Sequence, residues 1–210
     1  MTTERRILVT GGCGYIGSVL VPKVASKHEV VVLDSMAFGN QIEGIANVTP
    51  VKGDIRDYPL VNSVLDGVTD VIHLAAIAND PSSDLDPDMT RAVNRDAIVN
   101  LVDVAKSSGV TRFISASSSS VYGIKEEESV TEELSLSPLT LYAELKAESE
   151  KIVSGAANDL FTATSIRSAT VCGVSPRMRF DVIVNIMAKL AATNQVITVW
   201  GGDQQRPKEV

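Results

Sequence analysis

A tyrosine and a lysine stand four residues apart in the stretch Tyr142-Ala-Glu-Leu-Lys146. On a helix, side chains with this spacing share one face, so the phenol and the ammonium can point into the same cleft. A nearby cation favours the phenolate and lowers the tyrosine pKa toward a range useful for proton transfer. The same spacing also fits a half-buried tyrosine beside a surface lysine, so the pair alone does not decide between the two interpretations.

Four consecutive serines, Ser117 to Ser120, precede this pair at the carboxyl end of a predicted strand. Ligands of open α/β sheets bind at the carboxyl ends of the strands. A serine hydroxyl there can hydrogen-bond a substrate oxygen. The run also fits a serine-rich turn that caps the next segment, but its position favours a functional role for Tyr142 and Lys146.

The stretch GGCGYIG near the start of the chain places Gly11, Gly14 and Gly17 between the first predicted strand and the first predicted helix. Glycines there permit a tight turn, a close approach of the backbone to a pyrophosphate, and close packing of helix on strand. The helix N-terminus then offers free N–H groups to the phosphates. Asp34 ends the second predicted strand, where a carboxylate can bind an adenosine ribose or can cap a turn. No Arg or Lys follows it directly, so Ser35 and its neighbour favour NAD over NADP.

The elements that must position these residues alternate along the chain. Buried β-branched runs predict strands at residues 7–10, 30–33, 48–51, 71–75, 113–116 and 162–166. Apolar residues at helical spacing predict helices at 15–27, 58–65, 88–108, 138–156 and 181–192. Residues 80–87 are rich in Asp, Ser and Pro and predict a surface loop. This alternation is typical of an α/β fold with a doubly wound parallel sheet, Rossmann-like, with helices on both faces.

Composition excludes several classes of function. The chain has 210 residues and a net charge of −7, so it lacks the broad basic face that binds nucleic acid. No apolar run approaches the ~20 residues that cross a bilayer, so we expect no membrane association and a cytoplasmic protein. The two cysteines, Cys13 and Cys172, are too few for a disulfide scaffold or a Cys-based zinc site. We assign no metal ligand.

These motifs together resemble the extended short-chain dehydrogenase/reductase family, in the branch that holds nucleotide-sugar epimerases and dehydratases. The matching pieces occur in family order across nearly the whole chain. They are GGCGYIG, Asp34, Gly53-Asp-Ile-Arg-Asp57, His73-Leu-Ala-Ala76, Val93-Asn-Arg-Asp-Ala97, SSSSVYG, Ser137-Pro-Leu-Thr-Leu-Tyr-Ala-Glu-Leu-Lys146 and Ile166-Arg-Ser-Ala-Thr-Val-Cys-Gly173.

The resemblance implies a role for each residue. Tyr142 is the acid/base, Lys146 holds the nicotinamide ribose, Ser118 orients the reacting hydroxyl, and Asn94 supports the hydrogen-bond network of the active site. The residues implied to bind NAD are Gly11, Gly14, Tyr15, Ile16, Gly17, Asp34, Ser35, Asp54, Ile55, Leu74, Ala75, Ala76, Asn94, Tyr142 and Lys146. Those implied to bind substrate are Ser118, Ser119, Thr170 and Arg206.

The implied chemistry is transient hydride transfer between a sugar carbon and NAD, with Tyr142 as acid/base, in an epimerase of nucleotide sugars. Ser119 and Ser120 stand where related 4,6-dehydratases carry an acidic pair, which argues against that chemistry. Asp54 also fits a helix cap together with Asp57. Two alternatives stay open: a reductase or dehydrogenase of a small carbonyl compound, and a dinucleotide-binding module without turnover.

Two departures from the family pattern affect the substrate side. Thr170 stands where sugar-nucleotide members often carry Asn, and the chain stops at Val210, soon after Arg206. We therefore expect an NAD-binding domain at residues 1–174 and a partial substrate-binding lobe at residues 175–210. The resemblance also implies a homodimer, in which the helices predicted at 88–108 and 138–156 form a shared bundle.

Overall fold

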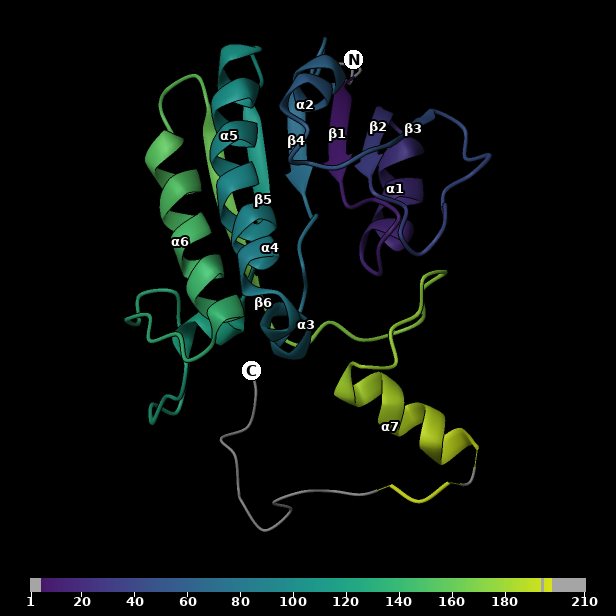
Figure 1. Cartoon of the computed structure of the whole chain (residues 1–210), viewed down its shortest axis with the longest axis vertical. Coiled ribbons are helices and arrows are strands. Elements are labelled where there is room, and N and C mark those ends of the chain that lie inside the picture. Colours follow the sequence, from purple (N-terminus) through teal and green to yellow (C-terminus); the bar gives the residue numbers. More distant parts are fainter. Residues whose placement is uncertain (1–4, 194, 198–210) are drawn as a thin grey trace.

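The computed structural model describes residues 5–193 and 195–197. Its centre is a parallel sheet of six strands in the order β3-β2-β1-β4-β5-β6 (Figure 1). The strands are β1 (Arg6–Thr10), β2 (Glu29–Asp34), β3 (Val48–Lys52), β4 (Asp70–His73), β5 (Arg112–Ser118) and β6 (Thr162–Ser168). The predicted strands and the doubly wound parallel sheet are confirmed, but the edge strands β3 and β6 contain no buried residue, so the prediction that they are buried is wrong.

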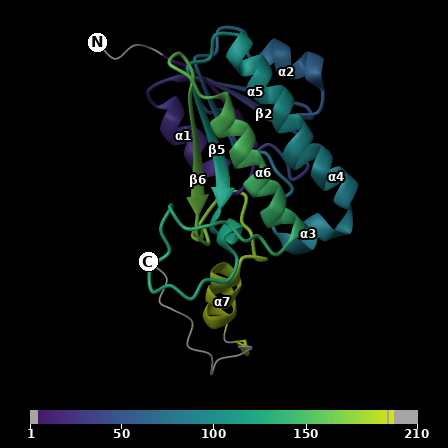
Figure 2. The same ribbon diagram turned by 90° about the vertical axis from the view of Figure 1, so that its left-hand side faces the viewer.

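Helices cover both faces of this sheet because successive strand residues point to opposite sides. On one face Leu8, Val31 and Phe113 pack under the helices α2 (Tyr58–Val64), α5 (Ala97–Ser107) and α6 (Leu141–Ala156). On the other face Val9 and Val32 pack against α1 (Gly17–Ala25). Figure 2 shows α1 and the α5–α6 pair on opposite sides of the sheet.

The predicted surface loop at residues 80–87 is wrong. The chain forms α3 (Asp80–Leu85) and α4 (Pro87–Arg91) there, capped by the side chains of Asn79 and Asp86. The prolines are compatible with these helices because Pro81 and Pro87 occupy the first turn of each helix, where the missing N–H is not needed. Both helices are short and lie beside the carboxyl ends of the strands.

The predicted helices differ from the observed ones in their details, and α7 begins two residues later than predicted, at Ile183. The helix predicted at 88–108 is a continuous run of α4, a π-helical turn η1 (Ala92–Asp96) and α5. The helix predicted from residue 138 begins at Leu141, because Thr140 caps it by accepting a hydrogen bond from the Ala143 N–H. The helix predicted from residue 15 begins at Gly17.

The chain beyond β6 leaves the sheet at the carboxyl ends of the strands. It runs through an irregular segment into α7 (Ile183–Ala192), which lies beyond that edge in Figure 1. A short 3₁₀ helix, η2 (Ser119–Tyr122), follows β5 at the same edge. The loops after the strands and the segment before α7 therefore meet at one end of the sheet.

Candidate active site

A cleft of about 630 Å³ opens at the carboxyl edge of the sheet. It lies where parallel α/β sheets bind their ligands. The predicted site residues that line it are Gly11, Gly14, Tyr15, Ile16, Gly17, Asp34, Ser35, Asp54, Ile55, Leu74, Ala75, Ala76, Ser118, Tyr142 and Lys146. Asn94, Ser119 and Thr170 do not line it, and Arg206 lies outside the described residues.

The glycine loop is so closely packed that larger residues do not fit. Gly11 has φ +73°, and a Cβ on it would lie 2.6 Å from the Ala75 backbone nitrogen. A Cβ on Gly17 would lie 2.5 Å from the Gly11 carbonyl oxygen. The loop therefore packs closely against the chain after β4 and against its own backbone, and it lines the cleft where α1 begins.

Asp34, at the end of β2, holds this loop from the neighbouring strand. Its carboxylate accepts hydrogen bonds from the Cys13 N–H at 3.0 Å and the Met36 N–H at 2.7 Å. The predicted alternative, that Asp34 caps a turn, is therefore present in the structure. Burial and the nearby Asp34 charge raise the pKa of the Cys13 thiol, so this thiol stays protonated.

Asp54 lies at the end of the cleft next to β3 and pairs with Arg56, whose guanidinium Nη2 is 2.6 Å from the carboxylate. This hydrogen bond, more than any other effect, lowers the pKa of Asp54. The N-terminus of α2 is capped by Asp57, which accepts the Leu60 N–H. Asp54 is thus not the cap of α2, and its carboxylate stays at the cleft.

The three residues predicted to carry proton transfer meet at the opposite end of the cleft. Tyr142 and Lys146 come from α6, and the Ser118 side chain at the end of β5 lies beside Tyr142 and favours its ionised form. The Lys146 ammonium nitrogen lies 5.7 Å from the centre of the Tyr142 ring and donates to the Ala116 carbonyl at 2.7 Å. Lys146 is only 6% exposed, so the alternative of a surface lysine is wrong.

The predicted lowering of the Tyr142 pKa is not found in this structure. Burial raises the pKa of Tyr142, and the nearby Asp80 carboxylate adds to that rise. The Ser118 hydrogen bond and the positive charge of Arg179 act in the opposite direction but do not overcome burial. Burial also lowers the pKa of Lys146 to about 8. The phenol and the ammonium are therefore both held in a poorly hydrated site.

Asn94 lies beneath the cleft, inside the π-helical turn. Its side-chain amide donates to the Ile77 carbonyl at 2.9 Å and accepts the Ile77 N–H at 2.8 Å. These bonds fix the chain after β4, where Ile77 lines the cleft. The Asn94 carbonyl also accepts a hydrogen bond from Ser149 on α6. Asn94 therefore connects the helix bearing Tyr142 to the loop after β4.

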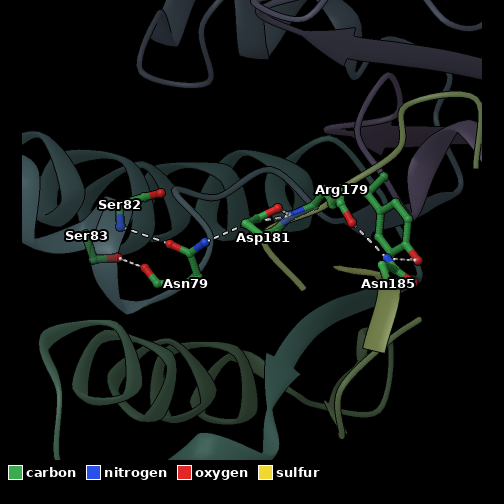
Figure 3. Close-up of polar contacts among 7 residues, drawn as sticks. Asn79, Ser82, Ser83, Arg179, Asp181 and Asn185 are labelled. Atoms are coloured by element: carbon green, nitrogen blue, oxygen red, sulfur yellow. Dashed lines mark hydrogen bonds and ion pairs between the residues drawn. The ribbon is translucent and has the colours of Figure 1, made fainter. Parts of the chain in front are cut away.

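The segment after β6 supplies cleft residues that the sequence analysis missed. Arg179 donates to Asp181 through Nε at 3.1 Å, and Asp181 accepts from the Asn79 side chain at 2.7 Å (Figure 3). The Arg179 hydrogen bond is the main effect that lowers the pKa of Asp181 to about 2. Arg177 also lines the cleft, with its guanidinium carbon 3.9 Å from the centre of the Phe38 ring. Charged residues at every second position of Arg177-Met-Arg-Phe-Asp181 were the sequence signal that could have identified this segment.

Tyr15 anchors this segment to the glycine loop. Its hydroxyl donates to the Gly173 carbonyl at 2.7 Å and accepts from the Asn185 side chain at 3.0 Å. Its carbonyl accepts from Ser175, whose hydroxyl also pairs with Ser18. Asn185 donates in addition to the Arg179 carbonyl, as Figure 3 shows. Hydrogen bonds from Tyr15 in the glycine loop therefore hold the segment after β6, which forms the other wall of the cleft.

Residues 5–193 and 195–197 show neither a metal site nor a membrane-spanning helix. Over this part of the chain no group of three His, Cys, Asp or Glu side chains could hold a metal ion. Within the same ranges no helix is long and apolar enough to cross a membrane.

Comparisons with known proteins agree with this geometry. The family model described as "NAD dependent epimerase/dehydratase family" matches residues 7–207. A UDP-glucose 4-epimerase from Lactobacillus helveticus is 29% identical over 94% of this chain and 64% of its own length. An uncharacterized UDP-glucose epimerase, YtcB of Bacillus subtilis, is 32% identical over 95% of this chain and 66% of its own.

Solved structures show the same likeness. UDP-N-acetylglucosamine 4-epimerase from Methanobrevibacter ruminantium, solved with UDP-N-acetylmuramic acid, has a TM-score of 0.86 and 25% identity over 94% of this chain and 66% of its own. MoeE5, solved with UDP-glucuronic acid and NAD, has a TM-score of 0.77 and 28% identity over 88% of this chain and 60% of its own. This chain thus spans less than two thirds of the length of these relatives.

Proposed function

The chain belongs to the NAD-dependent epimerase/dehydratase family, and from this premise we propose that it is the NAD-binding and catalytic part of a nucleotide-sugar epimerase. One observation carries the proposal. Ser118, Tyr142 and Lys146 meet at one end of a cleft whose other end is formed by the glycine loop and Asp34. A cofactor bound along this cleft would reach the proton-transfer residues.

The residues of the cleft fit NAD. The glycine loop lines the cleft with Gly11, Gly14 and Gly17, which carry no side chains, so the pyrophosphate can approach the backbone there. Asp34 would accept hydrogen bonds from the adenosine ribose, and its charge would repel a 2′-phosphate, which favours NAD over NADP. We assign the adenine to Asp54 and Ile55 and the chain near Leu74, Ala75 and Ala76 to the cofactor wall. The bound nicotinamide would supply reversible hydride transfer.

Residues of the protein would transfer the proton of the sugar hydroxyl group. Tyr142 takes the hydroxyl proton of the sugar through its phenol oxygen and returns it after the ketone has turned over. Ser118 orients the reacting oxygen through its hydroxyl, and Lys146 supplies the cation that favours the phenolate. Asn94 acts as a positioning residue through Ile77.

The substrate side rests on the names of the relatives, which act on or bind UDP-sugars. We propose a nucleotide sugar as the substrate, with Ser118, Ser119, Thr170 and Arg206 as contacts. Thr170 follows Ala169 and precedes Val171, both of which line the cleft. The division into an NAD-binding domain at 1–174 and a substrate-binding part from residue 175 belongs to the same proposal.

We further propose a cytoplasmic homodimer. Both cysteines are free, which suits a reducing compartment. α5 and α6 pack side by side on one face of the sheet, and their outward sides would form the shared bundle. Light scattering after size-exclusion chromatography tests the dimer, and a monomer at micromolar concentration would refute it.

The test of function uses the purified chain with a panel of UDP-, GDP- and dTDP-sugars and no added reductant. Mass spectrometry and absorbance first measure copurified NAD, and NAD and NADP affinities are then compared. We expect NAD binding and conversion of at least one sugar into its epimer. NADH oxidation with small ketones, without any epimerisation, would favour the reductase, and NAD binding without turnover would favour a binding module.

A further inference from the structure

Three consecutive residues at the end of β5 each engage one residue of α6. The Ala116 carbonyl accepts from Lys146, the Ser117 hydroxyl donates to Glu150, and the Ser118 side chain lies beside Tyr142 and favours its ionised form. Tyr142, Lys146 and Glu150 are spaced by four residues and share one helical face. Only the first two have a role in the proposed chemistry, although Glu150 is also buried, at 8% exposure.

Glu150 is held from two neighbouring strands, by Arg167 on β6 and Ser117 on β5. Arg167 on β6 donates to both carboxylate oxygens, with Nη2 at 2.8 Å and Nε at 3.0 and 3.1 Å. Ser117 donates to the oxygen that faces β5. Arg167 is itself held by the Tyr122 hydroxyl at 2.9 Å and the Glu132 carbonyl. These donors from β5 and β6 fix the position of the Glu150 carboxylate on α6.

Lys146 has few partners to offset the loss of hydration. The titratable groups that face it are His73 from β4, Tyr142 and Glu150 from α6, with Arg167 behind Glu150. Burial holds His73 neutral by lowering its pKa to about 3. Asp80 and Arg179 act on Tyr142. Glu150 is therefore the negative charge that favours the Lys146 ammonium.

We propose that Glu150 is a positioning residue, which keeps the buried Lys146 ammonium charged beneath Tyr142 while Arg167 and Ser117 hold its carboxylate in place. The inference rests on the proposed function in one respect, namely that the Lys146 charge serves Tyr142. Arg167 holds the Glu150 carboxylate in place, and its own positive charge opposes the charge on Lys146.

The experiment measures the charge on Lys146 directly. Protein labelled with ¹⁵N at the lysine side-chain nitrogens is titrated by NMR, and the Lys146 resonance is identified by its absence in Lys146→Met. The wild-type midpoint is expected near the pKa of about 8. Glu150→Gln is expected to lower it by about one pH unit, a tenfold change in the ammonium-to-amine ratio.

Two further variants separate charge from structure. Arg167→Gln removes the opposing positive charge and is expected to raise the Lys146 midpoint, whereas general loosening of the network would shift both variants in the same direction. Glu148→Gln is the matched control, because Glu148 lies on the same helix and pairs with Arg95 at 2.9 Å but is exposed. Its midpoint should equal that of the wild type.

An unchanged midpoint in folded Glu150→Gln would overturn the proposal. If that variant does not fold, Arg167→Gln decides, since a midpoint that stays or falls contradicts an electrostatic role. Sugar conversion is measured separately on the same proteins across pH. Absence of conversion by the wild type would refute the proposed function and leave the NMR result standing, so the two failures are distinguishable.

Discussion

Replacing Lys146 by Met should stabilise the protein at neutral pH. Burial lowers the Lys146 pKa from 10.5 to about 8, which corresponds to a cost of about 3 kcal/mol for holding the ammonium in the folded chain. Loss of the hydrogen bond to the Ala116 carbonyl offsets about 1 kcal/mol of that gain. The net expected rise in the free energy of unfolding is about 2 kcal/mol.

The stability gained by Lys146→Met should depend on pH. Below about pH 8 the lysine is charged in both the folded and the unfolded chain, so the full penalty applies. As the pH rises from 8 toward 10.5 the folded chain loses the proton first, and the penalty disappears. Lys146→Met should therefore gain stability over the wild type at pH 7 and lose that advantage near pH 10.5.

Urea unfolding at both pH values measures this difference. Lys151→Met is the control, because Lys151 is an exposed lysine of the same helix and its replacement should change stability little. A Lys146→Met protein that unfolds more easily than the wild type at pH 7 would show that the buried ammonium is net stabilising. That result would refute the reasoning.

Three other changes test the cleft. Asp34→Asn should weaken NAD binding by about tenfold or more, measured by calorimetry, because it removes a charged acceptor of ribose hydrogen bonds. Gly17→Ala should abolish NAD binding and lower the melting temperature, since its Cβ would lie 2.5 Å from the Gly11 carbonyl oxygen. Gly155→Ala, with nothing within 4 Å of its Cβ, should instead stabilise α6 by ~1 kcal/mol. Tyr142→Phe should slow sugar conversion by about 10²–10⁴-fold with an unchanged NAD affinity, and a conversion rate equal to the wild type would remove Tyr142 from its role.

The central strands were predictable because they are buried and rich in β-branched residues, as in Val30 to Leu33 of β2. The right-handed crossovers then follow from the general rule for parallel strands. The helix α3 was not predictable by the same logic. Its composition resembles a loop, and it forms because Asn79, with φ +83°, caps it and also bonds Asp181, a residue about a hundred positions away.

The candidate site divides in the same way. The predicted cofactor-binding residues belong to short local motifs, so the positions of Gly11, Gly17 and Asp34 at the cleft could be predicted from their spacing in the sequence. The other wall depends on long-range hydrogen bonds, such as those from Tyr15 to Gly173 and from Asn185 to Tyr15. No spacing rule connects these positions, so the arginines of that segment were missed.

The Tyr142–Lys146 pair does not by itself lower the pKa of the phenol in this structure. Spacing suggested that a nearby cation would suffice to lower the phenol pKa, but burial raises it. Two of the effects that oppose burial, the Ser118 hydrogen bond and the Arg179 charge, come from different walls of the cleft. Arg179 is directed by Asp181 and thus by Asn79. The segment after β6 therefore contributes to the electrostatics of the acid/base residue as well as to the shape of the cleft, so its position and the reactivity of Tyr142 are coupled.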